Sequence, residues 1–248
     1  MIWKRIFSRA FILLAIASAG LWGISLCIQG NAESYKNTYT CIKGYYANIY
    51  YGEECRPHSA TIMRIVDAYY PYLARDFGIP QNTKAEIAIH YDKEAMYGAI
   101  GKDYGEKPPM GAYYKGNIHI LSPGCWADEG ELSERFLAEG PVIHELAHFM
   151  LDKKVSGNYE IWFSEGIALY MEYKYMAYEW QADKDSADNI SFDEMPEYFK
   201  LSTQNLAYRL AFEQVKGLVD KYGEGALSDI YSQLSEKVAF HKAVEKYY

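Results

Sequence analysis

The sequence predicts an α+β fold in which strands and one helix come first and helices fill the rest of the chain. Two patterns support this prediction. Strand-like segments lie before residue 122, whereas apolar residues recur at helical spacing beyond it. Half of the 248 residues are hydrophobic, which is enough for one sizeable core. We therefore expect residues 33–248 to form one domain around a small antiparallel or mixed sheet.

The first half of the chain contains the predicted sheet and one long helix. Residues 58–77 have helical periodicity, which Pro71 interrupts. Gly78 is suited to end this helix, because glycine readily takes the left-handed conformation found just beyond a last helical turn. A loop rich in Gly and Pro is expected over residues 98–111. Strands are predicted over residues 42–51, 84–91 and 117–121.

The second half is expected to be helical throughout. Gly140 and Pro141 separate two candidate helices, and Pro141 fits the first position of the second because that position needs no N–H donor. An acidic, polar stretch then divides the helices that follow it from those that precede it. Helices are predicted over residues 131–139, 141–154, 161–180 and 205–234, the last of them divided near Gly223.

The N-terminus has the pattern of an export or anchoring segment. Three basic residues, Lys4, Arg5 and Arg9, precede an uncharged and mostly apolar run from Ala10 to Ile28. That run is longer than a typical signal-peptide core and just long enough to cross a bilayer. Residues 1–32 are therefore either a signal peptide or an uncleaved membrane anchor formed by residues 10–28. Both alternatives predict an extracytoplasmic domain, secreted or anchored to the membrane.

The charge of the remaining chain argues against nucleic acid as a partner. The whole chain has 25 basic and 33 acidic residues, for a net charge of −8. Without residues 1–32 the count is 22 basic against 33 acidic residues, or −11. A protein of this charge lacks the basic surface that attracts a phosphate backbone or anionic lipid.

Three cysteines follow the N-terminal segment. In an exported protein, Cys41 and Cys55 are plausible disulfide partners, because they bracket a segment that reads as a hairpin around Ala47 and Asn48. Cys125 is then left over. The chain has no CxxC pair, so a zinc site built from cysteines is not indicated.

The sequence HELAH, residues 144–148, lies within a predicted helix. Residues four apart lie on nearly the same helix face, so His144 and His148 can direct their imidazoles at one metal ion. Glu145 lies about 100° around the helix, where it can reach a water molecule on that metal. Zinc lowers the pKa of such a water, and a neighbouring carboxylate can then accept its proton. The alternative is a pair of ordinary core histidines.

A catalytic zinc site usually has three protein ligands, and Glu165 is the candidate for the third. It lies in the segment WFSEGIALYMEY, among apolar residues that would bury it, and a buried carboxylate needs a partner. Gly166 beside it would allow this helix to approach a neighbour closely. His119, on the predicted strand 117–121, has no ligand spacing to the other three and is interpreted as structural.

HELAH followed by WFSEG resembles the gluzincin-type zinc metallopeptidases, especially their small peptidase MA-like domains. The segments GAYYKGNIHILSP, ISFDEMPEYF and LAYRLAFEQVKGLVDKYGEGAL are similar to further parts of that family, so the resemblance covers roughly residues 60–245. It implies a zincin-like fold, with an edge strand over the active-site helix and a helical C-terminal half. We expect residues 117–121 to provide an open edge to which a peptide substrate can add.

The resemblance also implies roles for individual residues. His144, His148 and Glu165 would bind Zn²⁺, Glu145 would be the general base, and Tyr208 would lie near the metal and donate a hydrogen bond to the developing oxyanion. The implied function is a zinc-dependent metallopeptidase that acts on a peptide or protein. The gap to the third ligand is shorter than in aminopeptidase-type relatives, and no motif for a free substrate N-terminus is present. A catalytically inactive zincin-fold binding module at the cell exterior is the alternative, and an accidental HELAH is a third.

Overall fold

The computed structural model describes residues 33–101, 109–126, 140–179 and 190–247. The N-terminal segment 1–32 and the predicted helix 131–139 lie outside these ranges. Within the ranges, no helix combines the length and the apolar character needed to cross a membrane.

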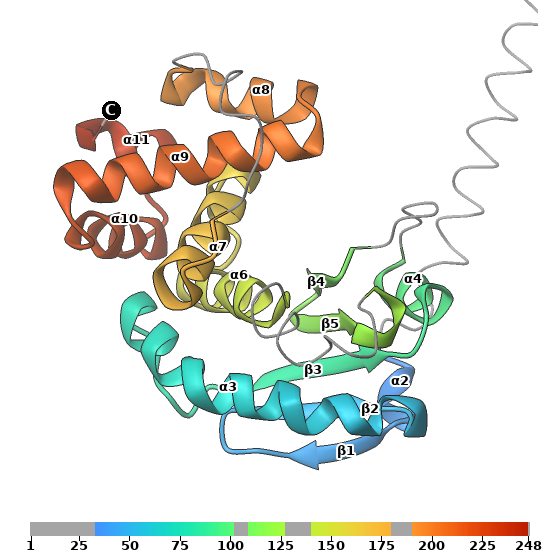
Figure 1. Cartoon of the computed structure of the whole chain (residues 1–248). Helices are drawn as coiled ribbons and strands as arrows, with labels where there is room; N and C mark the ends of the chain where they lie inside the picture. The colour runs from blue at the N-terminus through green and yellow to red at the C-terminus, as the bar shows by residue number, and fades with distance from the viewer. Residues whose placement is uncertain (1–32, 102–108, 127–139, 180–189, 248) are drawn as a thin grey trace, which may run out of the picture.

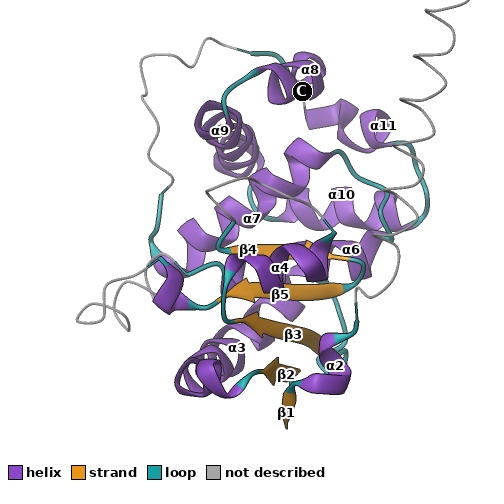
Figure 2. Cartoon of the chain, turned by 90° about the vertical axis from the view of Figure 1, so that its right-hand side faces the viewer, coloured by secondary structure: helices purple, strands orange, loops and turns teal. Residues whose placement is uncertain are grey.

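A five-stranded mixed sheet forms the first half of the fold, which confirms the predicted α+β class (Figure 2). The strands are β1 (Thr40–Lys43), β2 (Ala47–Tyr51), β3 (Ala85–His90), β4 (Gly111–Tyr114) and β5 (Asn117–Leu121). They lie in the order β1-β2-β3-β5-β4, with β2, β3 and β5 parallel. The outer strands β1 and β4 each run antiparallel to their neighbour, so both edges of the sheet end in an antiparallel strand.

Helices cover both faces of the sheet and build the second half of the fold. Figure 1 shows the sheet and α3 at one end of the molecule and α8 to α11 at the other, with α6 and α7 between them. The helices are α2 (Tyr35–Thr38), α3 (Arg56–Phe77), α4 (Lys93–Ile100), α6 (Val142–Val155), α7 (Ile161–Met176), α8 (Met195–Leu201), α9 (Gln204–Tyr222), α10 (Gly225–Ser235) and α11 (Phe240–Val244).

The two faces of the sheet contact different helices. On one face, Tyr113 of β4 lies against Phe149 of α6, with ring centroids 6.3 Å apart, and the buried residues of α3 belong to the same core. On the other face, Met96 and Ile100 of α4 pack with Leu121 in a separate small cluster. Because side chains alternate along a strand, neighbouring residues of the inner strands are buried on opposite faces.

Helix α3 continues through Pro71, so the predicted interruption is wrong. Proline removes one hydrogen bond, to the carbonyl of residue 67. Asp67 is exposed, so water can satisfy that carbonyl, while the opposite side of the helix is buried in the core. The helix ends at Gly78 with φ +63°, as the sequence predicted.

Cys41 and Cys55, which the sequence made plausible disulfide partners, are both free cysteines in the structure, as is Cys125. The predicted hairpin is present, but Cys41 lies opposite Tyr50 in it. Cys55 follows the end of β2 in a short 3-10 turn, where it is buried. Strand register therefore decides which side chain faces Cys41, and spacing along the chain does not.

Helices α7 and α9 approach each other closely at Gly166. A Cβ atom added there would lie 2.7 Å from Cγ2 of Val215 and 2.9 Å from the carbonyl carbon of Ala211, and closer still to the Ala211 oxygen. Carbon atoms in van der Waals contact are about 3.5–4.0 Å apart. The close packing expected from Gly166 is therefore present, and α9 is the partner helix.

Candidate metal centre

Three side chains from two helices converge in the space between α6 and α7. His144 and His148 lie one turn apart on α6, and Glu165 lies near the start of α7. The Oε2 atom of Glu165 is 3.2 Å from Nε2 of His144 and 3.7 Å from Nε2 of His148. Of the residues that the structure describes, these three form the group able to hold a metal ion, with ligand atoms within 4.8 Å of one another.

Two of the separations between these atoms are close to those of a tetrahedral metal site. With ligand bonds of about 2.0–2.1 Å, the ligand atoms of a tetrahedral site lie about 3.3–3.5 Å apart. The measured separations of 3.2 and 3.7 Å lie on either side of that value. The donor set of two imidazoles and one carboxylate is a usual one for catalytic zinc.

Each candidate histidine ligand has a partner for its other ring nitrogen. Nδ1 of His148 lies 2.7 Å from Oγ of Ser164, and Nδ1 of His144 lies 3.6 Å from Oε2 of Glu172. A hydrogen bond like that of His148 to Ser164 fixes the ring orientation and the tautomer of a ligand histidine, and the longer contact of His144 with Glu172 is an ion pair. Both therefore direct Nε2 at the shared space.

Sequence reasoning missed Ser164 and Glu172. Ser164 directly precedes Glu165, and Glu172 lies seven residues beyond it, on the same side of α7 two turns later. The seven-residue spacing from Glu165 to Glu172 indicated that both lie on the same side of the helix. Its meaning depended on where α6 crosses α7, and the two side chains are both buried at that crossing.

The charges of the candidate ligands stabilise one another. Burial favours a neutral carboxyl group, but His148 and His144 overcome it and hold the pKa of Glu165 well below its usual range. Burial likewise opposes a charged imidazole, but Glu165 and Glu172 together raise the pKa of His144. Glu165 is therefore ionised, which is the form that binds a metal.

Glu145 lies beside this group as a buried carboxylate, one oxygen of which can still accept hydrogen bonds. Its side chain is 5% exposed, and its Oε2 atom has no hydrogen-bond partner among the described residues. Burial raises the pKa of Glu145, against the opposing effect of His144 and His148. A buried polar atom without a partner is rare and points to a missing water or ligand.

Tyr208 comes to the same site from α9. Burial raises the pKa of Tyr208, and the charges of Glu165 and Glu145 add to this effect, so the phenol stays protonated. Gln204 is close enough to oppose part of this rise in pKa. The structure therefore brings His144, His148 and Glu165 together, with Glu145 and Tyr208 close enough for charge effects between them and this group.

Strand β4, rather than β5, is the edge nearest to the metal group. The expectation that residues 117–121 offer an open edge is wrong, because β5 is bonded to β3 on one side and β4 on the other. A Cβ atom added to Gly111 of β4 would lie 2.8 Å from Cγ and Oε1 of Glu145. The edge strand β4 thus passes directly over α6.

His119 lies on β5, outside the metal group. Its Nδ1 atom is 3.0 Å from Nε2 of His90 on β3, and the two rings are stacked with centroids 5.2 Å apart. Both side chains are about fully buried. This pair gives His119 a structural setting, in line with its interpretation from the sequence.

Comparisons of the chain with protein-family models, with curated proteins and with solved structures found no match. The arguments for a function therefore come from the residues and their geometry.

Proposed function

We propose that this protein is a zinc-dependent metallopeptidase of the gluzincin type, with a zincin-like fold. The main support is the convergence of His144, His148 and Glu165, with Glu145 buried beside them and one of its oxygens without a partner. The resemblance of HELAH and WFSEG to the gluzincins agrees with this arrangement.

Each residue of the site has a defined task in peptide hydrolysis. A zinc ion held by the two histidines and Glu165 would supply a Lewis acid and lower the pKa of a nearby water. Glu145 accepts the proton of the water that attacks the peptide carbonyl and passes it to the leaving amine. The raised pKa of Glu145 moves it toward the range in which a group both accepts and returns a proton.

Tyr208 and the edge strand position and stabilise the reacting peptide. The protonated phenol of Tyr208 donates a hydrogen bond to the oxygen on which negative charge develops. An extended substrate adds to the outer edge of β4, the last strand of the described sheet, whose Gly111 lies next to Glu145. Main-chain pairing of this kind binds many sequences, so the substrate class is an extended peptide or an unfolded segment of a protein.

Elemental analysis tests the metal centre separately from the chemistry. We expect about one zinc per chain in the wild type and a clear loss in Glu165→Ala. Glu160→Ala is the matched control, because Glu160 is an exposed carboxylate on the residue before α7. Zinc retained equally in both variants would remove Glu165 from the ligand set.

Hydrolysis of a peptide library tests the role of the base. Glu145→Gln should keep its zinc and lose roughly 10²–10⁴-fold in rate, since general-base catalysis contributes that much. Equal hydrolysis by this variant and by the wild type would refute the mechanism. Zinc binding without hydrolysis by the wild type would favour the alternative, a zincin-fold binding module.

A further inference from the structure

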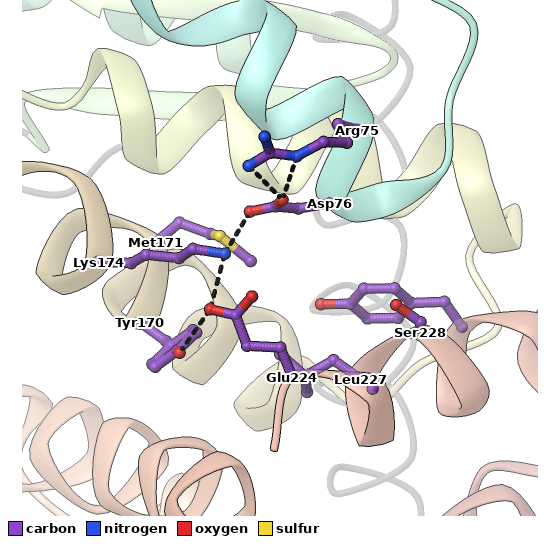
Figure 3. A pocket seen from close by; sticks show the side chains of 10 residues that line it. Arg75, Asp76, Tyr170, Met171, Lys174, Glu224, Leu227 and Ser228 are labelled. Atoms are coloured by element: carbon purple, nitrogen blue, oxygen red, sulfur yellow. Dashed lines mark hydrogen bonds and ion pairs between the residues drawn. The ribbon is translucent and has the colours of Figure 1, made fainter.

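A second polar site lies at the far end of α7 from Glu165. It is a pocket of about 170 Å³ between the end of α3, the last turns of α7 and the start of α10 (Figure 3). A single buried water needs only about 10–15 Å³, so the pocket has room for a larger guest. Its walls combine charged groups with Met171 and Leu227.

The charges of this pocket are arranged around one ammonium group. Nζ of Lys174 is 2.6 Å from Oδ2 of Asp76 and 2.8 Å from Oε1 of Glu224, as Figure 3 shows. Asp76 is the fixed partner: its side chain is 11% exposed and it also accepts hydrogen bonds from Tyr175 and Arg75.

Glu224 is the replaceable partner. Its side chain is 54% exposed, and it is the residue just before α10, where it caps no backbone N–H with its side chain. Besides the Lys174 ammonium, it accepts a hydrogen bond of 3.3 Å from the hydroxyl of Tyr170. Another carboxylate can take over both donors if the Glu224 side chain swings into solvent.

The pocket residue Tyr231 has a hydrogen-bond donor that does not bond to Glu224. Tyr231 is among the residues that line the pocket, its side chain is 1% exposed, and its buried hydroxyl has no hydrogen-bond partner among the described residues. A buried hydroxyl without a hydrogen-bond partner is rare, and a bound ligand is one explanation for it. The start of α10 adds the positive end of a helix dipole to the same space.

We propose that this pocket binds a small carboxylate with a short apolar tail. The carboxylate takes the place of the Glu224 side chain and accepts hydrogen bonds from Lys174, Tyr170 and Tyr231. The tail lies against Met171 and Leu227. The geometry points to a carboxylate rather than to other anions because Glu224 itself places one against two of the three donors.

An NMR chemical-shift titration of the full chain with butyrate tests this site, with phosphate and chloride at equal ionic strength as comparisons. We expect saturable butyrate shifts at α7 and α10, and tighter binding by Glu224→Gln, which removes the competing charge. Tyr231→Phe should weaken binding roughly tenfold or more. That variant loses no hydrogen bond to any residue that the structure describes, so its fold should be intact.

Tyr222→Phe is the matched control, since Tyr222 is 41% exposed and lies outside the pocket. It should bind butyrate as the wild type does. Absence of saturable shifts in both the wild type and Glu224→Gln would overturn the proposal. Equal binding by Tyr231→Phe, or phosphate binding as strong as that of butyrate, would overturn it as well.

Discussion

Replacing Gly166 with alanine tests how tightly the two helices that carry Glu165 and Tyr208 are packed. The added methyl would meet the backbone of Ala211 and the side chain of Val215 from α9. At 2.7 Å from Cγ2 of Val215, it is about 0.8 Å inside normal contact between carbon atoms. The nearest atoms belong to the backbone of a helix, which cannot rotate away from the methyl group as a side chain can.

The expected loss of stability follows from two opposing effects. Overpacking costs about 1–3 kcal/mol, and the rigid neighbour places this site at the upper end. Alanine in a helix regains about 0.5–1 kcal/mol relative to glycine. The net change in the free energy of unfolding is a loss of about 2 kcal/mol. For a domain of this size that lowers Tm by about 4–8 °C.

Gly217→Ala on α9 is the matched control. A Cβ atom added there meets nothing within 4 Å, so only the gain in helix propensity remains. It should therefore raise Tm by about 1–4 °C. Thermal unfolding followed by circular dichroism measures both variants. A Tm for Gly166→Ala at or above that of the wild type would refute the packing argument.

Three further predictions concern the site and the buried histidines. Ser164→Ala and Glu172→Gln should each weaken zinc affinity by roughly 10–100-fold in a chelator competition, because they hold the second nitrogen of a ligand histidine; unchanged affinity would contradict this role. Gly111→Ala should reduce peptide hydrolysis while zinc content stays near one per chain, because the added methyl group contacts Glu145. Normal activity would contradict this expectation and show that β4 can shift to make room for the methyl group. Burial lowers the pKa of His90 to about 3 and that of His119 to about 4, so in the unfolded chain these groups take up protons at a higher pH, near 6.5. The contribution of these two neutral histidines to the free energy of unfolding is thus fully present above about pH 6.5, and it is lost as the pH falls toward 4 and then 3. The urea midpoint of His119→Leu should therefore decline less steeply with falling pH than that of the wild type.

Local sequence determined the long helices α3, α6, α7 and α9 and the pair of histidines in the metal group, but α4 was not predicted and overlaps the loop expected from residue 98. The four-residue spacing of His144 and His148 needs only a helix to place both on one face, and α6 provides it. The end of α3 at Gly78 likewise follows from the conformational freedom of one residue. Such features depend on neighbours within a turn or two, so they can be predicted before any tertiary contact is known.

Tertiary structure decided everything that depends on which elements meet. The order of strands made β4 the edge and placed β5 inside the sheet. The crossing of α6 and α7 brought Ser164 and Glu172 to the histidines, and hairpin register kept Cys41 from Cys55. Pairing between distant segments is set by the burial of the whole apolar surface at once, and no single stretch of sequence contains that information.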